Sequence, residues 1–302
     1  MEPSPVSSQE SGHWSVWASV LLSVVVVIWF YGVETPFGSR GEYSAFSWIY
    51  GCWNEEYEYE HGFLSPFLIG GLIIYRFKDL KAVAKSGSAW GLVPVFLGVL
   101  LYIFAYRFPS PRIALCGLPF ILWGAAWFLW GWRVTKILTF PLFFFLLAIP
   151  WPRFQHELWY GNLLTASLVH HGCSLLGIQT YVEGLQVFPI KEGLPTMVIG
   201  ACSNGIPSLM PLLMICATWA FIAKIALWKK ALLFLAAFPL AILANALRMV
   251  SIFVIAEYGD ARWATATWYD WSKLLLVYPF SLIVLLMIHS ALAGRFPWRK
   301  AI

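Results

Sequence analysis

The sequence predicts an all-α membrane protein, a polytopic helical bundle with about eight transmembrane helices and a long outer loop between the fifth and the sixth. Three observations lead to this fold class. Of the 302 residues, 60% are hydrophobic and only 12% are charged, whereas an average soluble domain carries roughly a quarter charged residues. The chain also holds 18 Trp and 13 Tyr, and these two residue types concentrate at membrane–water interfaces. The apolar residues, finally, are gathered into long stretches.

About eight of these stretches approach the ~20 apolar residues that a helix needs to cross a bilayer. Some are short, and these imply tilt or a locally thinned bilayer. The expected crossings are residues 14–33, 61–76, 89–106, 112–130, 137–150, 206–224, 231–256 and 274–294.

Basic residues in the connecting loops predict the orientation of the bundle, because cytoplasmic loops carry an excess of Lys and Arg. The basic loops all fall on one side: Arg76, Lys78, Lys81 and Lys85, then Arg133 and Lys136, then Lys224, Lys229 and Lys230. Both termini are therefore expected in the cytoplasm. No basic region precedes the first apolar stretch, so a retained helix is expected rather than a cleaved signal peptide. The basic residues form no continuous face, which argues against nucleic acid as a partner.

The long segment 151–200 is expected on the outer side, between the fifth and sixth crossings. Residues 158–176 form an amphipathic portion that can lie in the membrane interface, and residues 179–188 alternate in character like a β-strand. No repeat or obvious linker divides the chain, so residues 1–302 are interpreted as one domain.

Cys202 is the first candidate for chemistry. It stands in Gly-Ala-Cys-Ser-Asn-Gly-Ile-Pro, where the outer segment enters the sixth crossing, with Ser203 or Asn204 as the expected N-cap. The backbone N–H groups and the positive dipole at a helix start favour a thiolate and can hold an oxyanion. The alternative is a cysteine that only packs as a small apolar residue.

Arg248 is the second candidate, because it lies deep in the seventh crossing, about 27 Å from the cytoplasmic end at ~1.5 Å per residue. A charge at membrane depth costs at least ~2.5 to 3.5 kcal/mol, and such residues usually face a cavity or a partner. The alternative is an arginine that snorkels to the headgroups. Asn245, about one turn earlier on the same face, could orient the guanidinium. Cys202 and Arg248 are expected at the same membrane face, where a thiol nucleophile and a fixed cation can meet.

His61 is a candidate for proton transfer at the outer start of the second crossing, since an imidazole can titrate near neutral pH. An interfacial histidine that merely hydrogen-bonds is the equally weighted alternative. His156, His170 and His171 lack the spacing of a metal site, and no P-loop or nucleophile elbow is present. Neither a metal nor any other cofactor is therefore expected.

Three motifs make the chain resemble the exosortase/archaeosortase family of polytopic membrane enzymes. Glu60-His-Gly-Phe-Leu64 is similar to the family's His-Gly-Phe-Leu entry to helix two, and Ala201-Cys-Ser203 is similar to its Ala-Cys-Ser-Gly nucleophile motif. Pro239-Leu-Ala-Ile-Leu-Ala-Asn-Ala-Leu-Arg248 resembles its Pro-x-Ala-Ile-x-x-Asn-x-x-Arg signature, the most specific of the three. The resemblance implies that Cys202 is the nucleophile and Arg248 the essential arginine.

The third catalytic position departs from the family pattern. Where the family places His in His-Asp-x-x-Gly, or an Arg, this chain has Tyr269-Asp270-Trp-Ser-Lys. A neutral phenol can donate a hydrogen bond or shuttle a proton, but it is a poor base at neutral pH. Asn204 is a second departure, because it stands where the family has Gly.

The resemblance implies a cysteine peptidase and transpeptidase of the cell inner membrane. Its substrates would be membrane-anchored proteins with PEP-CTERM-like C-terminal sorting signals, cut at the outer face and transferred to a surface anchor, with exopolysaccharide machinery as a further partner. Two alternatives stay open. A sorting-signal binder without catalysis would form no acyl-enzyme, and a transporter or lipid-binding scaffold would show no thiol dependence.

Overall fold

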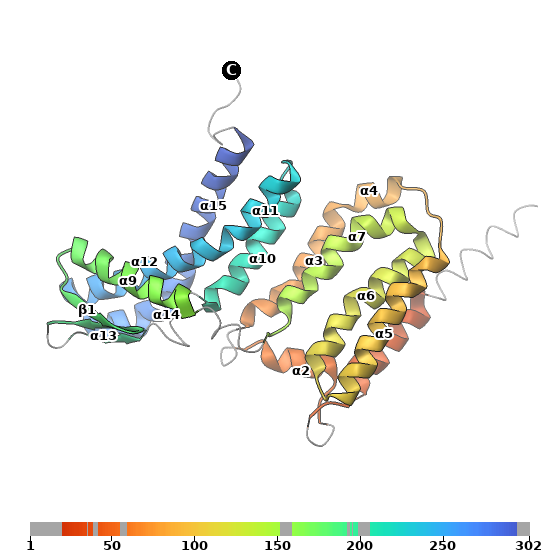
Figure 1. Cartoon of the computed structure of the whole chain (residues 1–302), viewed down its shortest axis with the longest axis horizontal. Helices are drawn as coiled ribbons and strands as arrows, with labels where there is room; N and C mark the ends of the chain where they lie inside the picture. Colours follow the sequence, from red (N-terminus) through yellow and green to blue (C-terminus); the bar gives the residue numbers. More distant parts are fainter. Residues whose placement is uncertain are drawn as a thin grey trace, which may run out of the picture. The chain divides into compact units, whose positions relative to one another are not determined.

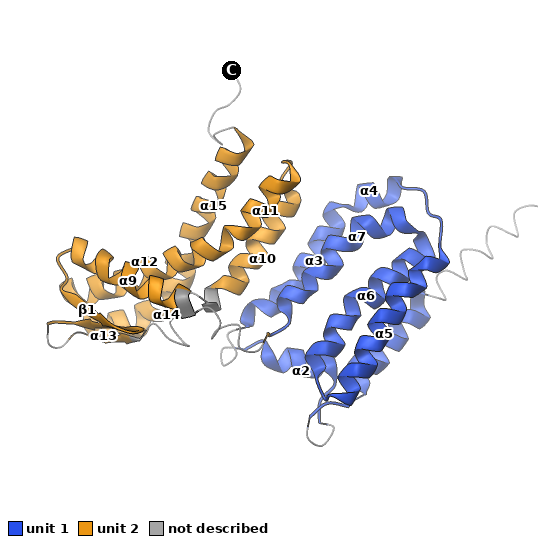
Figure 2. Ribbon diagram, viewed as in Figure 1, with its two compact units in different colours: residues 1–150 blue, residues 151–302 orange. Residues whose placement is uncertain are grey.

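The computed structural model describes residues 20–34, 36–38, 42–54, 59–151, 159–191, 194, 196–198 and 206–294. Over these ranges the chain is mainly helical, as the composition predicts (Figure 1). It divides into two compact units, residues 1–150 and residues 151–302, which Figure 2 shows in different colours. Each unit is described below by itself, and the interpretation of the chain as one domain stays a prediction.

The described part of unit 1 is built mainly from helices. It begins with the apolar helix Val20–Val33, whose last turn, η1 (Trp29–Val33), has π-helical hydrogen bonding. The further elements are α2 (Ala45–Cys52), η2 (Glu60–Leu64), α3 (Ser65–Tyr75), α4 (Phe77–Ala82), η3 (Ala89–Gly91), α5 (Leu92–Arg107), α6 (Pro111–Trp130), α7 (Trp132–Phe144) and η4 (Phe145–Ala148).

Unit 2 combines helices with one small sheet. Its elements are α9 (Trp159–Leu175), β1 (Thr180–Glu183), β2 (Gln186–Pro189), β3 (Met197–Val198), α10 (Ile206–Ile222), α11 (Leu227–Leu235), α12 (Ala237–Tyr258), α13 (Ala261–Trp263), η5 (Ala264–Trp268), α14 (Tyr269–Ser272), η6 (Lys273–Val277) and α15 (Tyr278–Ala293). The sheet is antiparallel with strand order β1-β2-β3, and Gln186 of β2 pairs with Val198 of β3.

The core of unit 2 lies between α9, the sheet and α12. Buried side chains from all three contribute, among them Val169 of α9, Val187 of β2 and Met249 of α12. Helix α9 and strands β1 and β2 form within the two stretches that the sequence marks as amphipathic and β-like. Packing onto α12 therefore fixes a segment that composition alone describes only as a long loop.

Helix forms in each of the eight apolar stretches, but their lengths differ from expectation. Four helices of the described ranges are long and apolar enough to cross a membrane: Ala89–Arg107, Pro111–Trp130, Leu227–Tyr258 and Ala261–Ala293. Val20–Val33 and Leu209–Ile222 are shorter apolar helices. The protein is therefore a multi-pass membrane protein, and the count of eight crossings stays a prediction.

The last helix begins well before the expected residue 274. The Asp260 carboxylate accepts hydrogen bonds from the backbone N–H groups of Arg262 (2.8 Å) and Trp263 (3.3 Å). This is an N-cap, which satisfies donors that a helix start otherwise leaves unpaired. Residues 261–273 are too polar to stand out in a search for apolar stretches, although the cap starts a helix there.

Candidate functional site

The helix Ala261–Ala293 departs from regular α-helical hydrogen bonding in two places. Two π-helical segments, η5 and η6, enclose the four residues of α14, Tyr269–Ser272. π-helical turns are rare, and they occur frequently at functional sites. The two irregular segments thus flank the residues that the sequence places at the third catalytic position.

The guanidinium of Arg248 binds α14. Arg248 lies in α12 with a relative exposure of 1%. Its Nε donates to Oγ of Ser272 over 2.9 Å, and its Nη2 donates to the backbone carbonyl of Tyr269 over 2.9 Å. Such burial excludes an arginine that snorkels to the headgroups. The charge is held inside unit 2, by hydrogen bonds in two directions.

The aromatic ring of Tyr269 also contacts this charge. The guanidinium carbon lies 4.3 Å from the ring centroid, within the range of a cation–π interaction. The ring therefore presents its face to the cation, while the backbone of the same residue accepts its hydrogen bond. Asp270 is exposed to solvent, whereas Asn245, one turn before Arg248, is fully buried.

Ser272 completes the contact between the two helices. It is fully buried, and its hydroxyl accepts from Arg248 while donating to the Tyr269 carbonyl over 3.0 Å. That carbonyl consequently accepts two side-chain hydrogen bonds. Side chains that enter the helical hydrogen-bond ladder are one recognised cause of helix distortion, and the contact lies where the π segments interrupt the regular pattern.

A second connection fixes the backbone of Arg248. Oγ of Ser251 donates to the Arg248 carbonyl over 2.6 Å, and Nε1 of Trp268 donates to the same hydroxyl over 2.8 Å. Helix α14 thus binds the Arg248 side chain directly, and Trp268 of η5 is connected to the Arg248 main chain through the Ser251 hydroxyl. The guanidinium has little freedom to move relative to the irregular segment.

The proposed nucleophile segment, with Cys202, Ser203 and Asn204, lies outside the described residues. The four cysteines that the structure does describe, Cys52, Cys116, Cys173 and Cys216, are free thiols. Burial raises the pKa of Cys173 to about 12 and raises the pKa of Cys52 as well. These two thiols are protonated at neutral pH, so neither is suited to nucleophilic attack.

His61 lies in unit 1, in the turn η2 ahead of α3. Its side chain is 8% exposed and packs on the Tyr59 ring at a centroid distance of 4.9 Å. Because burial penalises the charged imidazolium, the pKa of His61 falls to about 4. The expectation that this residue titrates near neutral pH is therefore wrong, since His61 is neutral there. A supporting role for it stays a prediction.

The glycine of the same motif has a packing function. A Cβ at Gly62 would lie 2.1 Å from Nε1 of Trp53, far inside contact distance. The indole cannot easily withdraw, because that nitrogen donates to the Ala148 carbonyl over 2.9 Å and the ring packs edge-on against Phe63. Gly62 thus lets the η2 turn approach the indole of Trp53, which follows α2 and donates its hydrogen bond to η4.

Sequence reasoning missed Ser272. Ser272 is part of the Tyr269-Asp-Trp-Ser-Lys motif, but no role was expected for it. A serine in an apolar helix usually only bonds to the backbone of its own helix. The available signal was spacing, since positions three apart lie on one helix face.

In the described part of the chain, no group of three His, Cys, Asp or Glu side chains could hold a metal ion.

Comparison with known families identifies this chain by its sequence. The family model of the transmembrane exosortases (EpsH) matches residues 53–288, more than half of the chain. The matched region includes both Arg248 and the Tyr269–Ser272 segment. Searches of curated proteins and of solved structures found no match.

Proposed function

Because this chain belongs to the transmembrane exosortase family, we propose that it is a cysteine peptidase and transpeptidase that cuts C-terminal sorting signals. The observation that carries this proposal is the buried Arg248 guanidinium, held by the Tyr269 carbonyl and the Ser272 hydroxyl. Family resemblance adds Cys202 as the nucleophile. A charge kept in an apolar interior is costly, and in membrane proteins such residues generally serve a function.

The first step forms a thioester. The Cys202 thiolate attacks the scissile carbonyl of the substrate, a C–S bond forms, and the carbonyl oxygen becomes an oxyanion. Arg248 stabilises this negative charge, because a guanidinium stays protonated throughout and cannot act as the base. When the oxyanion collapses, the C–N bond breaks and the C-terminal fragment leaves as an amine after taking up one proton.

The second step releases the product from Cys202. Attack by water on the thioester carbonyl gives a free carboxylate, which is simple proteolysis. Attack by an amine gives a new amide, which is transfer to a surface anchor. The amine loses one proton in this step, and water loses two, the second when the carboxylic acid ionises. In both cases the departing sulfur is again a thiolate. The thiol is therefore regenerated, with no cofactor in the balance.

Tyr269 and Ser272 position the arginine in this scheme. A freely rotating arginine must lose side-chain entropy before it can bind a transition state, whereas a guanidinium already fixed in position avoids that cost. Tyr269 would act through its ring face and its carbonyl. The exposed Asp270 and the buried Asn245 are supporting residues in the proposal, as are Ser203, Asn204 and His61.

We place the enzyme in the cell inner membrane, with both termini in the cytoplasm and Cys202 at the outer face. Its substrates would be membrane-anchored proteins with a short PEP-CTERM-like motif, an apolar helix and a basic tail. Exopolysaccharide machinery is a further proposed partner. The support is the family membership and the distribution of basic loops.

Tyr269 favours one second candidate. Because a tyrosine stands where the family commonly has histidine, the chain could bind sorting signals without cutting them. Such a protein would form the same complex with its substrate but no thioester. The two candidates differ in the fate of Cys202, which makes the covalent intermediate the decisive observable.

The test uses membranes from cells that co-express the chain with a protein carrying a C-terminal sorting signal. Wild type is compared with Cys202→Ala, Arg248→Lys and the control Cys173→Ala, each at normal membrane abundance. We expect processing by wild type and Cys173→Ala, with a hydroxylamine-sensitive adduct on Cys202. Arg248→Lys should lose roughly 10²-fold or more, because a lysine cannot reproduce the forked contacts.

Full processing by Cys202→Ala would refute the thiol mechanism. Co-purification of the unprocessed substrate with wild type, without an adduct on Cys202, would instead identify a binding protein. Loss of processing by Cys173→Ala at normal abundance would show that the thiol dependence is not specific to Cys202.

A further inference from the structure

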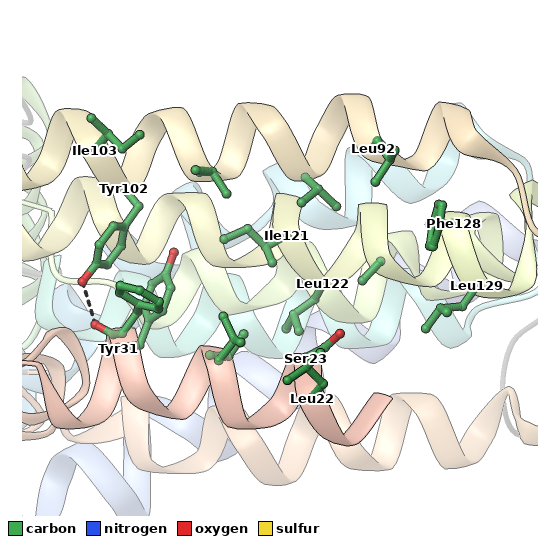
Figure 3. Close-up of a pocket in the computed structure, with 16 residues that line it drawn as sticks. Leu22, Ser23, Tyr31, Leu92, Tyr102, Ile103, Ile121, Leu122, Phe128 and Leu129 are labelled. Atoms are coloured by element: carbon green, nitrogen blue, oxygen red, sulfur yellow. Dashed lines mark hydrogen bonds between the residues drawn. The ribbon is translucent and has the colours of Figure 1, made fainter. Parts of the chain in front are cut away.

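Unit 1 contains an apolar groove of about 560 Å³ between three helices (Figure 3). The helices are Val20–Val33, α5 and α6, and the first of them precedes the region that the family model matches. No charged side chain occurs among the residues of the described helices that line the groove. The groove shares no lining residue with Arg248 and its partners, which belong to unit 2.

The floor of the groove is the tightly packed pair α5 and α6. A Cβ at Gly98 of α5 would lie 2.6 Å from the Gly117 carbonyl oxygen, and one at Gly124 of α6 would lie 2.6 Å from that of Gly91. Glycines at such crossings let helix backbones approach closely in a membrane. These contacts leave little room for α5 and α6 to separate, so the floor has a defined shape.

The helix Val20–Val33 forms the wall, and two tyrosines attach one end of it to the floor. The Tyr31 hydroxyl donates to the Ala114 carbonyl over 3.2 Å, and the Tyr102 hydroxyl donates to the Phe30 carbonyl over 2.7 Å. The two rings lie 5.0 Å apart between centroids. Figure 3 shows them together at one end of the groove, with Leu92 and Phe128 at the other.

Each helix turns one face to the groove. On α5 the lining residues recur at 92, 95, 99 and 102 to 103, the three- and four-residue spacing of a single helix face. From Leu92 to Ile103 the helix rises about 17 Å at ~1.5 Å per residue. That length exceeds half of the ~30 Å hydrocarbon core of a bilayer.

We infer that this groove binds one acyl chain of a membrane glycerophospholipid. The protein is embedded in a bilayer, and the floor belongs to two candidate membrane spans, so the groove opens where hydrocarbon is the solvent. An empty space of this size would forfeit the packing contacts of its lining. Water would find almost no hydrogen-bond partners along such a lining.

A single acyl chain matches the groove in chemistry and in length, because the lining is apolar and extends about 17 Å along α5. The absence of basic residues from its lining argues against recognition of a phosphorylated polyprenyl headgroup. The groove thus recognises only the hydrocarbon of the acyl chain, and an ordinary phospholipid of the bilayer supplies that acyl chain.

The test uses the full-length protein reconstituted with a phosphatidylcholine that carries a diazirine in the middle of one acyl chain. After extraction and extensive washing in detergent, the sample is illuminated and the adducts are mapped by peptide mass spectrometry. Washing removes lipid that only touches the outer surface. We expect the retained adducts on groove residues such as Val99 and Ala125 rather than on Leu97, at the opposite face of α5.

Two matched substitutions complete the experiment. Ala125→Trp fills the groove and should lower the adducts about tenfold, since the affinity of a lipid chain grows with each methylene group it buries. Leu97→Trp adds a similar ring at the opposite face and should leave them unchanged. Val26→Trp, on the wall, replaces Ala125→Trp if that variant does not elute as a folded protein. No retained adduct in wild type, or equal labelling in the two variants, overturns the inference.

Discussion

Nε of Arg248 donates a 2.9 Å hydrogen bond to Oγ of Ser272, and both side chains are closed to solvent. A buried charge needs partners, because an uncompensated one is strongly destabilising. Here one partner is a neutral hydroxyl on a helix with disrupted hydrogen bonding. Together with the Tyr269 carbonyl, this hydroxyl fixes the orientation of the guanidinium.

Ser272→Ala tests this relationship. The substitution removes one acceptor from the guanidinium, and a hydrogen bond to a charged group contributes about 1.5 to 3 kcal/mol. We expect processing to fall by roughly 10- to 100-fold, mainly in kcat, in a titration of substrate. Ser281→Ala is the matched control, because Ser281 is equally buried in the same helix and its hydroxyl has no partner among the described residues. Equal losses in both variants would show that the effect is general to buried serines.

Tyr269→Phe separates the ring from the hydroxyl. The contact with Arg248 uses the ring face and the backbone carbonyl, and phenylalanine preserves both. Processing by Tyr269→Phe should therefore stay within a few-fold of wild type. Tyr269→Ala should lose about 0.5 to 2 kcal/mol of cation–π stabilisation and the corresponding activity. If Tyr269→Phe is as inactive as Tyr269→Ala, the phenol takes part in proton transfer.

The stability of the protein should depend on His61 at acid pH. The folded-state pKa is about 4, below the ordinary value of about 6.5 for an unfolded histidine. Between these two pH values, His61 is protonated in the unfolded chain and neutral in the folded chain. The free energy of unfolding therefore falls as the pH drops through this window. The maximum loss is roughly 3 kcal/mol.

Melting temperatures in detergent at pH 7.5 and pH 4.5 check this expectation. The decrease between the two pH values should be smaller for His61→Gln than for wild type. His171→Gln, which changes an exposed histidine of α9, should behave like wild type. An unchanged decrease in His61→Gln would mean that the imidazole is already accessible to protons in the folded state.

Gly62→Ala should destabilise unit 1. The added methyl group would overlap the Trp53 indole, and overpacking of this kind costs about 1 to 3 kcal/mol. Gly70→Ala is the control, because a Cβ there meets nothing within 4 Å, and alanine favours a helix over glycine by roughly 0.5 to 1 kcal/mol. Thermal melting should show a lower Tm for the first variant and an equal or higher Tm for the second.

The sequence predicted the membrane class and the helix positions because hydropathy acts over many residues at once. Cys202 and Arg248 stood out for the same kind of reason, since each is conspicuous in an apolar setting. The structure then distinguished two interpretations of Arg248. Whether a guanidinium snorkels or is buried depends on the helix packed against it, and that information is not local to its own helix.

The remaining features depend on contacts between distant residues. Asp260 starts the last helix through a cap that hydropathy does not detect, and the charge state of His61 depends on the side chains that bury it. Ser272 acquires its importance only from Arg248, 24 positions earlier in the chain. The spacing of Tyr269 and Ser272 indicates only that both lie on one helix face, because the contact itself forms when α12 and α14 come together.

The π-helical segments at each end of α14 have a consequence for evolutionary change in this region. An α-helix rotates by about 100° per residue, and a wider turn accommodates one more residue before the regular rotation resumes. Deleting one residue from η5 or η6 would therefore convert that wide turn to a regular one and leave the side chains on either side pointing in their present directions. Relatives that lack one of these wide turns would then have one residue fewer here, with the flanking side chains in the same directions. In an alignment of such relatives, residues of this helix are best paired by the direction in which their side chains point, and not by their number along the chain.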